Sequence, residues 1–491
     1  MYLLGIDIGT SSIKVSVVDI ATRKRIATAQ YPDEEVEINS LRPGWAEQSP
    51  EIWWQHVTQA ILRLNATGGF DPKAIRAIGI AYQMHGLVLV DKDQNVLRDS
   101  IIWCDSRAVE LGEEAFTEIG EEKCLHHLLN SPGNFTASKL AWVKNNEPEL
   151  YQKIAKIMLP GDFIAMKLTG NITTSIPALS EGVFWDFRQD ELSKDIMEYY
   201  GFDQNIIPDI QPLFSVHGQL NSEIAAQLGL QEGIPVAYKS GDQPNNALSL
   251  NVLRPGEVAA TAGTSGVIYG VSDALIYDPE SRVNTFAHVT YSTTQKHTGM
   301  LLCINGTGSM YRWAKHNFAP DLSYNALNEL AATAPIGSKG LKVLPFGNGA
   351  ERILNNKYTG AQLLGIDLNV HGKPEIFRAV QEGIAFAFRY GLDIMRENGM
   401  QPTVIRAGMA NLFLSELFAQ TFVDVTGVPV ALYENDGSVG AAIGAGIGAG
   451  IFESVEEAFL HHEPVRYLEP KNTEAYEPLY TEWKLFLNKA L

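Results

Sequence analysis

The stretch from Tyr2 to Asp19, YLLGIDIGTSSIKVSVVD, gives the strongest indication of the fold. Its first half is a short apolar run that ends on Asp7 and a Gly-Thr-Ser turn, which predicts a strand and a tight hairpin. Residues 11–19 alternate apolar and polar types with a period of two, which indicates a second strand rather than a helix. A charged turn at residues 22–25 and a further β-like run to Ala29 complete a predicted meander.

The same pattern of strand, Gly-Thr-Ser turn and strand recurs in residues 256–270, GEVAATAGTSGVIYG. One such hairpin near the start of each half suggests two like-folded halves that face each other. A chain of 491 residues also suits two large domains better than one. We expect the boundary near residues 241–253, with an N-terminal domain at 1–245 and a C-terminal domain at 246–491.

Several helices are predicted outside these hairpins. Ser49 and Pro50 stand as N-cap and first residue of a helix over residues 51–64. Long helical patterns cover residues 374–397 and 414–426, and a helix rich in small residues covers 441–450.

Composition limits the partners that we expect. The chain has 38 Lys and Arg against 57 Asp and Glu, a net charge of −19, which argues against nucleic acid or an anionic membrane as main partner. Three scattered cysteines predict neither a disulfide framework nor a metal cluster, and the N-terminus has no basic signal-peptide region. The longest apolar run, residues 439–452, is shorter than the ~20 residues of a membrane span. These features predict a cytoplasmic protein.

The two Gly-Thr-Ser hairpins are candidate phosphate sites. A tight hairpin with Gly at its bend points consecutive backbone N–H groups into a concavity that suits a phosphate. Asp7, just before the first turn, could hold the Mg²⁺ that nucleotide phosphates bring. An ordinary hairpin turn is the alternative, but the second copy at residues 263–266 favours the phosphate interpretation. The chain contains neither a Walker A motif nor a Gly-x-Gly-x-x-Gly turn after its first strand.

Asp242 is a candidate general base. It follows the short predicted strand 235–238 and stands between Gly241 and a polar run, where a carboxylate could accept a hydroxyl proton during phosphoryl transfer. From these residues alone, a turn or an Asx cap is the more frequent role of such an acid.

Two further segments could recognise hydroxyl groups. Gln83-Met84-His85-Gly86 interrupts a strand-like stretch with polar groups, although a lone His is more often structural. Trp103-Cys104-Asp105-Ser106-Arg107 sets a carboxylate and a guanidinium two residues apart. In a strand the pair would share a face, where a structural ion pair is a more ordinary role than gripping a polyol.

In their order and separation these segments resemble the FGGY family of carbohydrate kinases nearly end to end, and within it the xylulokinases. The residues that carry the resemblance are Asp7 to Lys14, Gly44 to Pro50, Gln83 to Leu89, Trp103-x-Asp105-x-Arg107, Leu159 to Asp162, Lys167 to Gly170, Gly241-Asp242, Gly263 to Gly266, Gly349 to Arg352 and Arg406 to Val430.

The resemblance implies an α/β fold of two actin-like (ribonuclease H-like) ATPase domains flanking a deep cleft, with ATP and Mg²⁺ as cofactors. It implies that Asp242 is the general base and that Asp7 holds the metal. It assigns the sugar to Gln83, Met84, His85, Trp103, Asp105, Arg107 and Gln243, and the nucleotide to Gly9, Thr10, Ser11, Lys14, Gly263, Thr264, Ser265, Gly308, Gly408 and Asn411.

The activity that the resemblance implies is ATP-dependent phosphorylation of a ketopentose, D-xylulose to D-xylulose 5-phosphate, by a possible homodimer. Asp242 is followed by Gln243, as in glycerol kinases, where xylulokinases usually have Asn-Ala. Kinases of glycerol, ribulose or gluconate in the same family therefore stay open as alternatives. A non-metabolic actin-like ATPase that binds protein partners is a further alternative.

Overall fold

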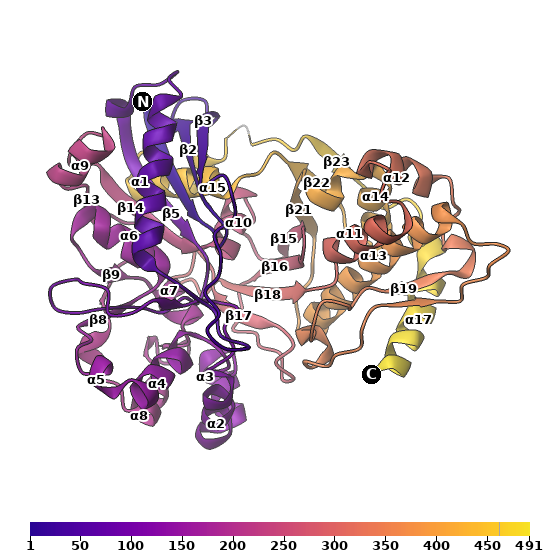
Figure 1. Cartoon of the computed structure of the whole chain (residues 1–491), viewed down its shortest axis with the longest axis horizontal. Coiled ribbons are helices and arrows are strands. Elements are labelled where there is room, and N and C mark those ends of the chain that lie inside the picture. The colour runs from indigo at the N-terminus through magenta and orange to yellow at the C-terminus, as the bar shows by residue number, and fades with distance from the viewer. Residues whose placement is uncertain (461) are drawn as a thin grey trace.

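Two mixed β-sheets organise the chain, one in each of the two lobes of the computed structural model, which describes residues 1–460 and 462–491 (Figure 1). The six-stranded sheet of the N-terminal lobe has the order β13 (Gly218–Gln219), β14 (Pro235–Gly241), β5 (Ile75–Tyr82), β1 (Tyr2–Ile8), β2 (Ile13–Asp19) and β3 (Arg25–Tyr31). The seven-stranded sheet of the C-terminal lobe has the order β17 (Asn284–Ala287), β18 (Thr298–Ile304), β16 (Gly266–Ser272), β15 (Glu257–Ala262), β21 (Val404–Gly408), β22 (Val430–Tyr433) and β23 (Arg466–Leu468).

The two sheets share one topology. In the N-terminal lobe β1, β2 and β3 form an antiparallel meander, and β5 and β14 then add in parallel on the other side of β1. In the C-terminal lobe β15, β16 and β18 form the meander, and β21 and β22 add in parallel beside β15. The like-folded halves predicted from the recurring hairpin are therefore confirmed.

The remaining elements surround these sheets. The helices are α1 (Pro50–Ala66), α2 (Val109–Ile119), α3 (Glu121–Leu128), α4 (Thr136–Asn146), α5 (Pro148–Tyr151), α6 (Pro160–Thr169), α7 (Ile176–Glu181), α8 (Lys194–Tyr200), α9 (Ser222–Leu228), α10 (Asp242–Ser249), α11 (Gly308–Phe318), α12 (Tyr324–Ala332), α13 (Lys373–Glu397), α14 (Glu416–Thr426), α15 (Gly437–Gly448), α16 (Val455–Ala458) and α17 (Thr473–Ala490). Short 3₁₀ turns include η4 (Arg352–Leu354) and η5 (Asn411–Leu414). Small two-stranded sheets pair β4 (Glu47–Gln48) with β7 (Ser100–Ile101), β6 (Val88–Val90) with β8 (Lys156–Met158), β12 (Asp209–Ile210) with β9 (Thr173–Thr174), β10 (Trp185–Asp186) with β11 (Glu191–Leu192), and β19 (Lys342–Leu344) with β20 (Gln362–Leu364).

Strand β1 is buried on both faces because a helix layer covers each of them. Leu4, Ile6 and Ile8 pack toward α1 and α6, whereas Leu3, on the opposite face, packs toward α15. The period of two therefore sorts one apolar run into two separate cores.

Helix α15 belongs to the second half of the sequence but packs on the sheet of the N-terminal lobe (Figure 1). The approach is so close that a methyl group on Gly5 would overlap the carbonyl oxygen of Ser438, and one on Gly79 would overlap that of Ala441. Glycine at these two strand positions lets the helix lie against the sheet, and the chain thereby ties its two halves together.

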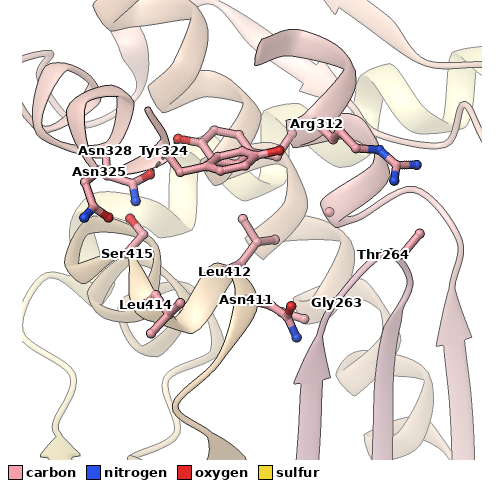
Figure 2. Close-up of a pocket in the computed structure, with 13 residues that line it drawn as sticks. Gly263, Thr264, Arg312, Tyr324, Asn325, Asn328, Asn411, Leu412, Leu414 and Ser415 are labelled. Atoms are coloured by element: carbon pink, nitrogen blue, oxygen red, sulfur yellow. Dashed lines mark hydrogen bonds between the residues drawn. The ribbon is translucent and has the colours of Figure 1, made fainter. Parts of the chain in front are cut away.

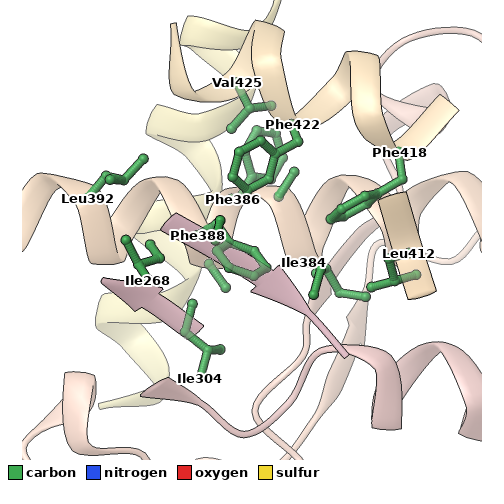
Figure 3. Close-up of a cluster of buried hydrophobic side chains, with 14 of the residues drawn as sticks. Ile268, Ile304, Ile384, Phe386, Phe388, Leu392, Leu412, Phe418, Phe422 and Val425 are labelled. Atoms are coloured by element: carbon green, nitrogen blue, oxygen red, sulfur yellow. The ribbon is translucent and has the colours of Figure 1, made fainter. Parts of the chain in front are cut away.

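The core of the C-terminal lobe lies between its sheet and the helices α11 to α14 and α17. Figure 3 shows its centre, where Phe388 of α13 lies between Ile268 of the sheet and Phe422 of α14. The Phe388 and Phe422 ring centroids are 5.1 Å apart in an edge-to-face arrangement. This core fixes the sheet edge that carries the second hairpin.

The helix predictions are confirmed with small shifts at the ends. The predicted helices over residues 51–64, 374–397, 414–426 and 441–450 correspond to α1, α13, α14 and α15. Ser49 occupies the N-cap position of α1, but its side chain makes no capping hydrogen bond. No helix within the described ranges is long and apolar enough to cross a membrane.

Candidate active site

Three parallel strands bring the predicted catalytic segments to one edge of the N-terminal sheet. Ile8 of β1 pairs with Tyr82 of β5, and Tyr82 pairs with Gly241 of β14. The three strands therefore end in register, and the residues that follow them are Gly9, Gln83 and Asp242. Polar segments far apart in sequence meet because the carboxyl ends of parallel strands point the same way.

The first hairpin is fixed both by a hydrogen bond within its turn and by hydrogen bonds to side chains of neighbouring loops. The Gly9 N–H donates to the Ser12 carbonyl at 3.1 Å and closes the turn. The Thr10 hydroxyl accepts a 2.9 Å hydrogen bond from Trp103 Nε1 and donates to Gln83 Oε1 at 3.2 Å. Gln83 is almost fully buried, so its side chain ties the hairpin to the neighbouring loop.

Asp7 and Asp242 form a pair of carboxyl groups at this edge. Burial raises the pKa of Asp242 to about 7, and repulsion from Asp7 adds to the shift. Burial also raises the pKa of Asp7 to about 6, with repulsion from Asp436 adding and Lys14 opposing. Asp242 stays partly accessible at the start of α10. A carboxyl group with a pKa near 7 is well matched to taking a proton at neutral pH.

Asp436 is a site residue that the sequence interpretation missed. It caps α15 by accepting from the Ser438 N–H at 3.0 Å, and its Oδ2 lies 2.5 Å from Lys14 Nζ. The Lys14 charge is therefore compensated by Asp436 in this structure. Arg25 makes a second ion pair with Asp436, at 3.1 Å.

Met84 lies against Gly241, the residue that precedes Asp242, and Glu181 connects this contact with His85. A methyl group on Gly241 would stand 2.7 Å from Met84 Cγ and 2.8 Å from Glu181 Oε2, so the three groups are packed together. His85 has φ of +63°, in the left-handed region that non-glycine residues rarely occupy. Its N–H donates to Glu181 Oε1 at 3.1 Å, which holds this conformation.

His85 is a neutral imidazole with a defined orientation. Burial lowers its pKa to about 3, and the charges of Lys139 and Arg352 add to the shift. Nδ1 lies 3.0 Å from the Glu181 carbonyl oxygen, which can only accept, so Nδ1 carries the proton. Nε2 is then left without a proton, so it can accept a hydrogen bond from a hydroxyl group of a polyol.

Lys139 connects the His85 loop with the Trp103 loop. Its buried ammonium donates to the carbonyl oxygens of His85 and Ile102 at 2.9 and 3.0 Å. Burial lowers the pKa of Lys139 to about 7, and Asp105 is the largest opposing influence. Trp103 itself is 52% exposed, so its ring is available to a ligand.

The structure places Asp105 and Arg107 in a buried ion-pair cluster and not on an open surface. They do not lie in a strand, and their carboxylate and guanidinium groups meet at 2.7 Å. Arg107 also pairs with Glu47 at 2.6 Å, and its side chain is only 1% exposed. Both side chains are buried in this ion-pair cluster, which favours the structural role that their spacing also allowed, and a sugar contact by either residue stays a prediction.

The second hairpin is joined to the start of α11. The Gly308 N–H donates to the Gly263 carbonyl at 2.9 Å, and the Ser309 N–H donates to that of Thr264 at 3.1 Å. Glu351 supports this junction by accepting from the N–H groups of Asn305 and Gly306 at 3.0 and 3.1 Å.

A cavity of about 320 Å³ begins at this hairpin and runs between α11, α12 and η5 (Figure 2). Gly263 and Thr264 lie at one end, and Asn325, Asn328 and Ser415 lie at the other. Asn328 Oδ1 accepts from the Tyr311 hydroxyl at 2.6 Å and from Gln381 at 3.1 Å, which leaves the Asn328 amide nitrogen as a donor. The lining residues are Ala262, Gly263, Thr264, Gly308, Tyr311, Arg312, Tyr324, Asn325, Asn328, Asn411, Leu412, Leu414 and Ser415.

Four residues expected on the nucleotide side line this cavity, namely Gly263, Thr264, Gly308 and Asn411. Gly408 does not line it and lies against Asn435 instead. The other lining residues of α11 and α12 were missed, because an amphipathic helix shows its buried face in the sequence but not what that face borders. They are Tyr311, Arg312, Tyr324, Asn325 and Asn328.

Comparisons with known proteins agree with this geometry. The family model described as "FGGY family of carbohydrate kinases, N-terminal domain" matches residues 2–249, and its C-terminal counterpart matches residues 258–449. A xylulose kinase of Bacillus subtilis is 30% identical over 98% of this chain and 96% of its own. The crystal structure of a xylulose kinase from Rhodospirillum rubrum is 27% identical, with a TM-score of 0.88 over 100% of this chain and 99% of that one. A Plasmodium falciparum glycerol kinase with ADP has a TM-score of 0.89 at 21% identity, over 100% of this chain and 98% of that one.

Proposed function

The chain belongs to the FGGY family of carbohydrate kinases, with an actin-like ATPase fold, and we propose that it phosphorylates D-xylulose with ATP to give D-xylulose 5-phosphate. The observation that carries the proposal is the convergence of Asp242, Asp7 and the Met84-His85 loop at one strand edge. A proton acceptor, a phosphate hairpin and a polyol-binding loop are the parts that sugar phosphorylation requires. The 30% identical relative named xylulose kinase supports the choice of sugar.

In the proposed reaction the terminal hydroxyl oxygen of the sugar attacks the γ-phosphorus of ATP in line. The new O–P bond forms as the bond to the bridging oxygen breaks, and its electron pair leaves with ADP. Asp242 takes the hydroxyl proton, and the backbone N–H groups of the two hairpins bind phosphate oxygens. Positioning supplies most of the rate, since general-base help is worth about 10²–10⁴-fold.

The residues at the edge fit Mg²⁺, which would neutralise phosphate charge when bound. Asp7 and Asp242 repel each other, and the Lys14 ammonium is already paired with Asp436. No described group of three or more His, Cys, Asp or Glu residues forms a metal cage. One or two carboxylates completed by water and phosphate oxygens is the usual magnesium arrangement, so Asp7 is the proposed protein ligand.

The cavity beside the second hairpin suits the nucleoside part of ATP. It is within the size range of small-molecule sites and combines apolar walls with a few polar groups. The hairpin residues Gly263 to Ser265 would then meet the phosphates, and Asn325 or Asn328 would meet the base.

A substrate panel tests the choice of sugar. D-xylulose, ribulose, glycerol and gluconate are compared by coupled detection of ADP, and the proposal requires a large kcat/KM preference for D-xylulose. Preference for glycerol would assign Gln243 its role in glycerol kinases and reject the ketopentose. ATP turnover that is independent of sugar but stimulated by a peptide would instead indicate an ATPase that binds protein partners.

A cytoplasmic location and a homodimer are further parts of the proposal. All three cysteines are free thiols, which fits a reducing compartment. Light scattering of the purified protein measures the mass of the assembly and decides between monomer and dimer.

A further inference from the structure

One guanidinium in the C-terminal lobe has no role in the mechanism so far. Arg352 begins η4, which packs on β18, and its Nη1 donates a 2.6 Å hydrogen bond to Asn284 Oδ1. Across residues 1–460 and 462–491, no carboxylate lies within ion-pair distance of this guanidinium. None of its nitrogens is buried without a partner, so its other N–H groups are open to solvent. Burial lowers the pKa of Arg352, with only Cys303 opposing, as expected when no anion compensates the charge.

Arg352 lies across the boundary between the lobes from the reacting groups. Asn284, its partner, shares a face of β17 with Phe286, and the Phe286 ring centroid is 5.4 Å from that of His85. The Arg352 charge therefore reaches His85, where it adds to the effect of burial and of Lys139 in lowering the pKa.

Arg352 also lies beside the second phosphate hairpin, because η4 packs on β18 and Cys303 of β18 pairs with Val267, which follows Gly266 of that hairpin. Burial raises the pKa of the Cys303 thiol to about 11, while Arg352 lowers it and Asp242 raises it. The guanidinium of Arg352 therefore lies between the second hairpin and the His85 loop, on the side of the C-terminal lobe.

Two other cations of the site already have partners. Lys14 is paired with Asp436, and Lys139 donates to two backbone carbonyls. A transferring phosphoryl group carries negative charge on its outer oxygens and arrives beside the carboxylates of Asp7 and Asp242. Within the described residues Arg352 has no carboxylate partner, so it keeps donors free for such a group.

We propose that Arg352 binds the phosphoryl group during its transfer and the phosphate of the sugar product after it. The inference rests on the proposed kinase function. As the bond from the γ-phosphorus to ADP breaks and the bond to the sugar oxygen forms, the guanidinium donates N–H groups to the outer phosphate oxygens. Its planar fork matches these oxygens, which a lysine ammonium cannot reproduce.

A purely structural role makes a different prediction. Asn284 Nδ2 donates to Asn130 Oδ1 at 3.1 Å, so the Arg352–Asn284–Asn130 chain could simply join the lobes. In that case an Asn284→Asp change would strengthen the contact with Arg352 by giving it a carboxylate partner, while the hydrogen bond to Asn130 would be lost because Asp has no N–H donor. If Arg352 instead binds phosphate, the same change neutralises its charge and lowers turnover.

The experiment compares Arg352→Gln, Arg352→Lys, Asn284→Asp and Asn284→Ala in the full-length protein. For Arg352→Gln we expect kcat to fall about 10²–10³-fold, the cost of losing one preorganised donor to a developing anion. We expect the KM of the sugar to change less than about threefold, because the contact is made to phosphate. Asn284→Asp should lose at least tenfold in kcat, while Asn284→Ala should keep most of it.

Binding measurements add a readout that a structural tie would not move. Calorimetry should show that Arg352→Gln weakens the affinity for D-xylulose 5-phosphate at least tenfold while leaving that for D-xylulose unchanged. Normal kcat in Arg352→Gln, a loss confined to the sugar KM, or full activity in Asn284→Asp would each overturn the inference. The kinetics use the best acceptor of the substrate panel, so rejection of D-xylulose would refute the proposed function and leave the Arg352 test intact.

Discussion

Replacing Asp242 by Asn should greatly slow turnover and at the same time stabilise the protein. The change removes the proton acceptor, so we expect kcat to fall by about 10²–10⁴-fold while ATP still binds. It also removes a carboxylate whose ionisation the fold disfavours, since burial and repulsion from Asp7 raise the Asp242 pKa from 3.8 to about 7. Loss of the Asp242 carboxylate thus lowers the activity and raises the stability of the protein.

The size of the stabilisation follows from the pKa. Each pKa unit is worth about 1.4 kcal/mol, so ionising Asp242 costs the folded state up to about 4 kcal/mol above pH 7. Partial exposure of the carboxylate and the desolvation of the new amide reduce this gain to about 1–3 kcal/mol. The folded state binds the proton more tightly than the unfolded chain, so wild-type stability falls as pH rises from about 4 to 7. The stability gained by the Asp242→Asn change therefore grows over the same pH interval and is constant at higher pH.

Two measurements check this prediction. Coupled detection of ADP gives kcat, and thermal unfolding of wild type and variant between pH 5 and 8.5 gives the difference in stability. The wild-type kcat/KM should rise with pH and level off above about 7, as Asp242 loses its proton. Near-normal turnover of Asp242→Asn, or a stability difference that is constant with pH, would contradict the assignment of Asp242 as a buried base.

Three further changes test other parts of the site. Lys139→Met releases the two loop carbonyls that the ammonium holds, so the sugar KM should rise about tenfold with the ATP KM unchanged, and an equal rise in both would argue against a local effect. Gly308→Ala drives a methyl group into the Gly263 carbonyl, so calorimetry should show at least tenfold weaker binding of ADP, and unaltered affinity would separate this junction from the nucleotide site. Gly79→Ala collides with the Ala441 carbonyl, so chemical denaturation should show a loss of about 3 kcal/mol or more, and a smaller loss would mean that α15 can move off the sheet.

The sequence alone determined the two hairpins, the two like-folded halves and the family, because these depend on local patterns. The period-two strands and the Gly-Thr-Ser turns at residues 9–11 and 263–265 are visible without any distant contact. The sequence also showed that Asp242 follows a short strand, but the residues around it by themselves favoured an ordinary turn.

Only the tertiary structure decided which of these residues act together. Burial raises the pKa of Asp242 to about 7, and repulsion from Asp7 adds to the shift because β14, β5 and β1 end in register and bring the two distant residues to one sheet edge. Asp105 and Arg107 become a buried ion pair because the loop folds inward around Glu47. Electrostatic roles of this kind depend on burial and long-range neighbours, which strand pairing creates and sequence spacing does not encode.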